Sequence, residues 1–162
     1  MKQFLACFLF ATLVASAAIP PADPFVGTWT LNARKSKYPA GDVPKRMVIR
    51  MDAENDGIRY RSETTDVNGR SSTAEYVADY SGREAVVKGG VGLLLPVSLK
   101  HVDRYTVEAS YSRGFQVVAT SRRAVSKDGR VMTITTTSKD KDGKSITNVG
   151  VYERTPERNL DR

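Results

Sequence analysis

Apolar and polar residues alternate with a period of two along most of the chain. In residues 46–52, for example, Met47, Ile49 and Met51 share one face. This period is typical of antiparallel strands that have one face in the core and one face in water. No segment keeps the 3.6-residue period of an amphipathic helix over several turns. The pattern therefore predicts an all-β protein.

Short glycine-containing pairs separate the alternating runs and predict the turns between strands. These pairs are Asp56-Gly57, Asn68-Gly69, Ser81-Gly82, Arg113-Gly114, Asp128-Gly129 and Asp142-Gly143. Asn-Gly and Asp-Gly supply the positive φ angles that tight hairpins need. We expect about ten strands at the spacing of a barrel or sandwich, near residues 25–31, 46–52, 58–65, 70–80, 84–88, 97–102, 105–112, 115–125, 130–138 and 145–154.

Consecutive hairpins make an up-and-down meander, which leaves two exposed edges unless the sheet closes. The fold that we predict is therefore a single antiparallel up-and-down β-barrel of about ten strands, over residues 18–154.

Two stretches interrupt the alternation of apolar and polar residues. Residues 32–45 contain Pro39, Gly41 and Pro44, which exclude one long helix and favour a crossing loop. Residues 89–96 combine glycines with leucines and form either a barrel corner with inward leucines or an apolar lid.

The N-terminus has the features of a signal peptide. Residues 4–14 are apolar, follow a lysine and are too few to span a bilayer, and Ala15-Ser16-Ala17 supplies the small residues of a cleavage site. We expect removal of residues 1–17 and export to the periplasm or the extracellular medium. A membrane anchor is the less favoured alternative. Residues 155–162 are polar and are expected to form a C-terminal tail.

The amino-acid composition excludes several kinds of functional site. The 162 residues include one cysteine, Cys7, which lies in the signal segment, and one histidine, His101. A disulfide framework and a Cys/His metal cluster are thereby excluded. No pair of inward carboxylates suited to hydrolysis is visible. We expect a protein that is not an enzyme, has no cofactor and is a monomer. His101 shares the face of Val97 and Leu99, which favours a core histidine over a heme ligand.

Both ends of the chain carry a family resemblance. Residues 24–31, with Gly27-Thr28-Trp29, resemble the first strand of the calycins, the superfamily of lipocalins and fatty-acid-binding proteins. Residues 123–133 and 148–154 are similar to the closing strands of fatty-acid-binding proteins. The chain also resembles secreted bacterial lipocalin-like proteins. The resemblance implies an interior cavity for a small hydrophobic molecule. It also implies that Trp29 plugs one end of the barrel, with Arg154 stacked on it.

The same resemblance implies two ligand-binding residues. In fatty-acid-binding proteins two arginines and a tyrosine hold the ligand carboxylate. Arg123 matches the first arginine and Tyr152 matches the tyrosine, while Gly150 stands at the position of the second arginine.

The alternating pattern bears on Arg123 independently, because it shares its face with Phe115, Val117, Ala119 and Ser121. A guanidinium on this inward face needs an anion, carbonyl groups or water. An anionic ligand would satisfy it with two parallel hydrogen bonds. An internal carboxylate or a solvent-exposed position at the rim are the alternatives, and Tyr152 is as well explained by packing.

Charge suggests a second function. The formal net charge is +7, and a cluster of arginines falls on the outward face of one hairpin region: Arg46, Arg50, Arg59, Arg61 and Arg70, with Arg122 and Arg130 nearby. Such a basic face attracts anionic lipid or other polyanions, although Asp52, Glu63 and Asp66 partly neutralise it. Export and the absence of interleaved aromatic residues argue against nucleic acid.

Two functional hypotheses follow. The first is an exported, non-enzymatic protein that binds a small hydrophobic or amphiphilic, in one variant anionic, ligand in its lumen. The alternative is a surface-interaction protein that binds an anionic membrane surface or another polyanion through its basic face and has a filled lumen.

Overall fold

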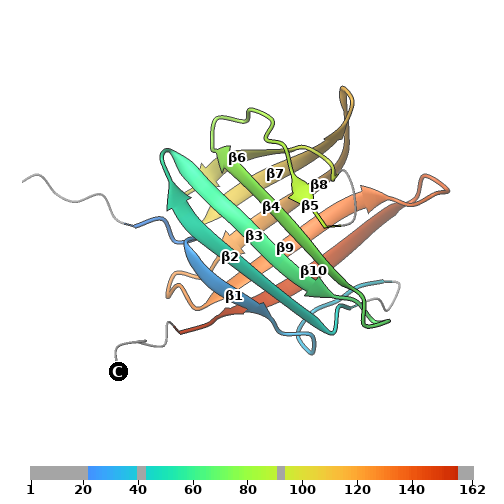
Figure 1. Ribbon diagram of the computed structural model, residues 1–162, viewed down its shortest axis with the longest axis horizontal. Helices are drawn as coiled ribbons and strands as arrows, with labels where there is room; N and C mark the ends of the chain where they lie inside the picture. The colour runs from blue at the N-terminus through green and yellow to red at the C-terminus, as the bar shows by residue number, and fades with distance from the viewer. Residues whose placement is uncertain (1–21, 40–42, 91–93, 157–162) are drawn as a thin grey trace, which may run out of the picture.

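Ten antiparallel strands form one curled sheet in the computed structural model, which describes residues 22–39, 43–90 and 94–156 (Figure 1). The strands are β1 (Gly27–Leu31), β2 (Arg46–Glu54), β3 (Gly57–Thr65), β4 (Ser71–Asp79), β5 (Lys88–Gly89), β6 (Val97–Asp103), β7 (Thr106–Arg113), β8 (Gln116–Val125), β9 (Val131–Lys139) and β10 (Ser145–Arg154). Their order is β5-β4-β3-β2-β1-β10-β9-β8-β7-β6. No helix occurs within the described ranges, so the predicted all-β meander is confirmed.

The expected signal peptide and residues 157–162 of the expected tail lie outside the described residues. In the part of the chain that the structure covers, no helix is long and apolar enough to cross a membrane.

The two ends of the chain lie side by side, because β1 pairs with both β2 and β10. Trp29 is opposite Arg154 in the ladder between β1 and β10, and the hydroxyl oxygens of Thr30 and Thr155 are 2.8 Å apart. Lys37 extends this contact through a bridge to Val149 of β10. The predicted closure of the first strand on the last is therefore confirmed.

On the other side of the roll, the two edges of the sheet are joined by fewer residue pairs than β1 and β10. The chain leaves β4, and Ser81 bridges to Lys100 and Ala85 to Val97 of β6. The Ala85 nitrogen donates to the Val97 oxygen at 2.7 Å, and the Val97 nitrogen donates to the Ala85 oxygen at 3.0 Å. The chain then returns, and Gly89 pairs with Ala74 of β4. The strand expected at residues 84–88 is thus replaced by two bridges and the two-residue β5, because this segment serves both edges of the sheet in turn.

One turn differs from the sequence prediction. The hairpin between β2 and β3 turns at Asn55, whose φ is 47°, and Glu54 pairs with Gly57. Gly57, expected to supply the positive φ angle, is instead the first residue of β3. A Cβ atom at Gly57 would overlap the carbonyl oxygen of Ala78 on β4, so close strand packing explains this glycine.

Inward-facing apolar side chains form one core inside the roll. The largest fully buried ones are Trp29, Phe25, Ile49, Met51, Ile58, Leu99, Met132, Val97 and Val107. The Trp29 indole nitrogen donates to the Phe25 oxygen at 2.9 Å, and the Arg154 guanidinium carbon lies 4.1 Å from the ring centroid of Trp29. The predicted plug and the predicted stacking of Arg154 are both present. The interior also contains the polar cluster described next.

Candidate functional site

Arg123 is an interior residue of β8 and is 3% exposed. Ser121 and Val125 on the same strand are also buried, as the alternation predicts, and Ala119 is half-buried. Phe115 and Val117, which were expected on this inward face, are exposed. The reason is local: Phe115 lies in the turn between β7 and β8, and the register of the two strands shifts after Tyr111.

Tyrosine side chains surround the guanidinium of Arg123. Nη1 donates to the Tyr76 hydroxyl at 2.7 Å, and Nη2 donates to the Tyr111 hydroxyl at 3.1 Å. The guanidinium carbon is 5.3 Å from the ring centroid of Tyr60. Tyr60 and Tyr76 stack on one another, with centroids 4.6 Å apart and ring planes 10° apart. The tyrosines come from β3, β4 and β7, so the sheet must curl for them to meet β8.

No carboxylate balances this charge. Among the described residues, no Asp or Glu lies within ion-pair distance of Arg123. Its Nε atom is buried and has no hydrogen-bond partner in the same residues. An arginine has five N–H donors, and the two bonds to tyrosine use one on each Nη atom. The expected alternatives, an internal carboxylate pair or a solvated rim position, are therefore not what the structure contains.

The electrostatics keep the arginine charged and two of its neighbours neutral. Burial raises the pKa of Tyr60 and of Tyr76, more than the charge of Arg123 lowers it. Burial also raises the pKa of Tyr111, but the Arg123 charge and hydrogen bonds with Ser121 and Arg123 outweigh burial, so that pKa is lowered. Burial lowers the pKa of Arg123. The negative charge that Tyr76, Tyr111 and Tyr60 carry only when deprotonated raises that pKa well above its ordinary value.

A cavity of about 290 Å³ opens beside this cluster. Its lining combines polar and apolar side chains: Tyr60, Ala74, Tyr76, Val87, Leu94, Leu95, Tyr111 and Arg123. Leu94 and Leu95 belong to the glycine- and leucine-rich segment and face the lumen, in agreement with the expected inward leucines. Residues 91–93 of that segment lie outside the described residues.

Tyr152, the second predicted site residue, lies in the interior but not in the lining of this cavity. It is 3% exposed, and its hydroxyl donates to the Met47 sulfur at 3.2 Å. Burial is the main cause that raises its pKa. The ring takes the space beside Gly150, where an added Cβ would be 2.8 Å from a ring carbon of Tyr152. The structure thus places Arg123 at the cavity and Tyr152 behind it. The ligand role of each remains a prediction.

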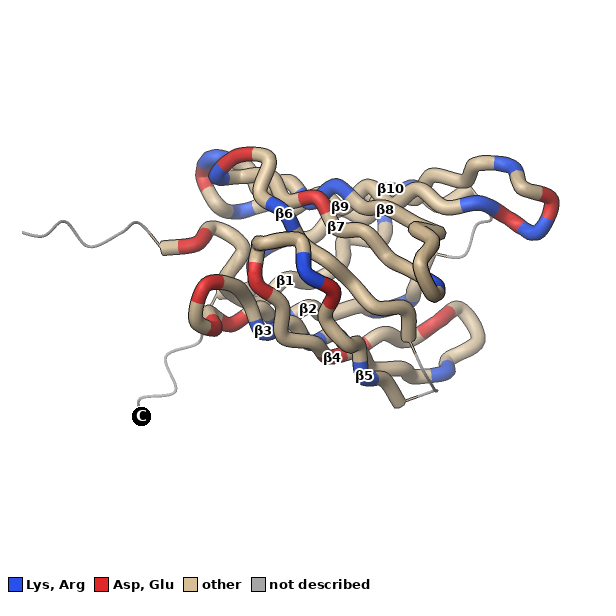
Figure 2. Tube along the Cα trace, turned by 90° about the horizontal axis from the view of Figure 1, so that it is seen from above, with Lys and Arg blue, Asp and Glu red and all other residues tan. Residues whose placement is uncertain are grey.

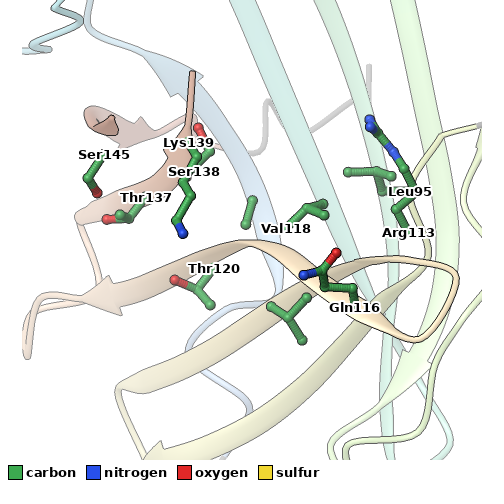
Figure 3. A pocket seen from close by; sticks show the side chains of 11 residues that line it. Leu95, Arg113, Gln116, Val118, Thr120, Thr137, Ser138, Lys139 and Ser145 are labelled. Atoms are coloured by element: carbon green, nitrogen blue, oxygen red, sulfur yellow. The ribbon is translucent and has the colours of Figure 1, made fainter. Parts of the chain in front are cut away.

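A second hollow of about 540 Å³ lies where β8 and β9 separate, beyond the pair Ala119–Ser138 (Figure 3). We call it the outer groove. Its lining includes Gln116, Val118 and Lys139. Leu95 stands across the groove from Lys139 (Figure 3) and lines both the outer groove and the Arg123 cavity. Leu95 is therefore the side chain common to the two spaces.

His101 is exposed near the end of β6 and is not part of the cavity lining. Its ring centroid lies 3.8 Å from that of Tyr80, and the Tyr80 hydroxyl donates to Asp23 at 2.6 Å. The inward position that a heme ligand requires is not observed, because the parity shared with Leu99 continues past the edge of the core. Within the described ranges, no three His, Cys, Asp or Glu side chains are placed to hold a metal ion.

The outward arginines are largely paired with acids. The ion pairs are Arg46–Glu63, Arg50–Asp52, Arg59–Glu54, Arg59–Glu75, Arg61–Asp52, Arg70–Asp66 and Arg122–Glu108, at 2.6–3.8 Å. Figure 2 shows basic and acidic positions interleaved along the chain rather than gathered on one face. The predicted basic face is therefore electrostatically mixed.

Comparison with known proteins supports the fold. No protein-family model matches the sequence, and no curated protein matches it either. Among solved structures, the chain is similar to zebrafish ileal bile acid-binding protein complexed with cholic acid, with a TM-score of 0.52 and 12% sequence identity. The match covers 82% of this chain and 99% of that chain. At this identity the likeness concerns the fold alone, and the predicted calycin-like fold is confirmed.

Proposed function

We propose that the protein is a non-enzymatic binding protein that holds a small hydrophobic or amphiphilic molecule in its lumen, with an anionic group of that molecule on Arg123. The observation that carries the proposal is the buried guanidinium beside a cavity, with no carboxylate partner in the described residues and with Nε unpaired.

Energetics supports a ligand at this position. Burial of an unpaired charge costs several kcal/mol, even after relaxation of the surroundings. The hydroxyl groups of Tyr76 and Tyr111 offset part of that cost as neutral acceptors. An anion supplies the remaining Coulombic attraction and accepts the unused N–H groups in bidentate geometry. The apolar side chains around the cavity then contact the rest of the molecule.

The structural neighbour is consistent with this role, since it is a bile acid-binding protein complexed with cholic acid. We further propose that residues 1–17 direct export of the chain and that the protein works as a monomer. The alternative function, attachment to anionic lipid through the basic face, has less support because the arginines of that face are paired with acids and the lumen contains a cavity.

Isothermal titration calorimetry with a panel of amphiphiles tests the proposal. The panel contains octanoate, decanoate, palmitate, 2-naphthoate and cholate. We expect at least one of them to bind with a stoichiometry of one, and Arg123→Gln to weaken that binding by about tenfold or more, since it removes hydrogen bonds from a charged group.

Arg122→Gln is the matched control. Arg122 is the neighbouring residue of β8, is exposed and pairs with Glu108 at 3.8 Å. Its replacement removes the same charge from the other face of the sheet, and we expect unchanged affinity. Equal affinities in both variants would contradict the assignment of Arg123, and no binding of any member of the panel would contradict the proposed function.

A further inference from the structure

We infer that the ligand is a compact aromatic monocarboxylate, about two fused rings in size, and that Leu95 sets this upper limit. The inference rests on the proposed function and deepens it. It differs from what the structural neighbour alone suggests, because a bile acid is a much larger molecule than the cavity accepts.

The volume of the Arg123 cavity indicates the size of the ligand. A dry, apolar cavity of about 150 Å³ in another protein is known to hold one benzene ring. The Arg123 cavity, at about 290 Å³, is close to twice that volume and lies at the lower end of the range for small-molecule sites. By this scale it accommodates roughly 12 non-hydrogen atoms. A two-ring acid or a ten-carbon chain matches this volume, whereas palmitate and cholate exceed it.

The charge of the cavity lining indicates how many anionic groups the ligand has. Arg123 is the residue of the cavity lining with a positive charge. Burial raises the pKa of Tyr60 and of Tyr76, whereas Arg123 and Ser121 lower the pKa of Tyr111. One positive charge in a low-dielectric interior favours one negative charge, because a second would be buried without a counter-ion. The unpaired Nε–H, together with an unused N–H of an Nη atom, matches the two oxygens of a carboxylate.

The lining favours rings over a flexible chain. Tyr60, Tyr76 and Tyr111 contribute three aromatic side chains to the cavity, with Val87 and Leu94 among the apolar remainder. Aromatic pairs in offset or edge-to-face contact gain free energy beyond the area that they bury. A fused ring system also loses little conformational entropy on binding, while a ten-carbon chain of similar volume must give up several rotations.

Leu95 limits the length of the ligand because it stands between the cavity and the outer groove and lines both. Truncation of this side chain to alanine removes that shared wall. The cavity then continues into the outer groove of about 540 Å³, which is large enough for the tail of a long-chain acid. A change of preferred ligand length on a single substitution is therefore expected.

Calorimetric titration of the full-length protein tests the ligand class. We expect 2-naphthoate to bind roughly 2- to 10-fold more tightly than decanoate, from the additional free energy of aromatic contacts. Palmitate, the neutral 2-naphthalenemethanol and the dianion naphthalene-2,6-dicarboxylate are expected to bind more weakly than 2-naphthoate. Decanoate affinity equal to or above that of 2-naphthoate would overturn the aromatic assignment.

Leu95→Ala tests the length limit, with Val86→Ala as the control. Val86 is apolar, belongs to the segment that follows β4, is 68% exposed and lines neither space. We expect Leu95→Ala to raise palmitate affinity above that of the wild type, and Val86→Ala to leave every affinity unchanged. A palmitate affinity that does not rise in Leu95→Ala would overturn the role of Leu95.

The failures of the two proposals are distinguishable. If wild-type protein binds palmitate or cholate most tightly and Arg123→Gln abolishes that binding, the proposed function stands and the compact ligand class is wrong. If no anion binds to the wild type, the proposed function itself fails.

Discussion

Replacement of Arg154 by methionine removes three hydrogen bonds at once from the point where the ends of the chain meet. The Arg154 guanidinium donates to the backbone oxygens of Val26 at 2.6 Å, Pro24 at 2.7 Å and Gly129. It also covers the ring of Trp29. One side chain therefore connects the N-terminal segment, the turn between β8 and β9, and the last strand.

The expected loss follows from these contacts. Three hydrogen bonds at a net value of about 1 kcal/mol each give about 3 kcal/mol, and the cation–π contact adds about 1 kcal/mol. Methionine retains some apolar cover of Trp29, but it leaves three carbonyl groups without their donor. We expect Arg154→Met to lower the free energy of unfolding by about 4 kcal/mol.

Equilibrium unfolding in urea measures the change, followed by far-UV circular dichroism and by the fluorescence of Trp29, the one tryptophan of the chain. Arg122→Met is the control, because an exposed arginine with an ion pair at 3.8 Å contributes about 0.5 kcal/mol or less. A loss in Arg154→Met of less than about 1 kcal/mol would refute the view that this side chain holds the ends together.

Three further outcomes are expected. Gly27→Ala should destabilise the fold by about 2–4 kcal/mol, because φ is 135° and a Cβ there overlaps the guanidinium of Arg154. Gly69→Ala, with φ 84° and open space around it, should cost only about 1 kcal/mol. Equal urea midpoints for the two variants would contradict this expectation. The hydrogen bond from the Ser81 hydroxyl is the main cause that holds the pKa of Asp79 at about 2, below the ordinary 3.8. The Asp79 carboxylate therefore stabilises the fold fully above pH 3.8 and loses this contribution as the pH falls towards 2. An NMR titration should find a higher pKa for Asp79 in Ser81→Ala. Arg123→Met should change the free energy of unfolding by about 1 kcal/mol or less, because release of a buried unpaired charge offsets the lost bonds to tyrosine; a loss above about 3 kcal/mol would identify the guanidinium as a structural group instead.

The period-two alternation was sufficient to predict nearly every strand to within about two residues. It does so because one face of each strand packs in the core and the other faces water, so the order of apolar and polar residues indicates which side chains are buried. The segment after β4 escaped prediction because it pairs with β6 and then with β4, each over too few residues to produce a repeating pattern. The turn at Asn55 was missed because Gly57 looks like a turn residue but is required by the close approach of β4.

The candidate site was predictable only in part. The parity of β8 indicated that Arg123 points inward, and the structure agrees. Tyr60 and Tyr76 also lie in alternating runs and prove to be buried, yet the alternation says nothing about which side chains meet across the interior. Arg123 and Tyr76 are 47 positions apart and lie on strands that are not paired. Contacts of this kind depend on how far the sheet curls, which no local pattern specifies.

The pairing of β1 with β10 has a consequence for how the chain acquires its structure. β1 has β2 as its neighbour on one side, but its other neighbour is the final strand, about 125 residues later. During synthesis, the roll stays open along that side until Arg154 has emerged. Pairing over so long a sequence separation slows folding. A polypeptide cut short before β10 would expose one full side of β1 and invite aggregation.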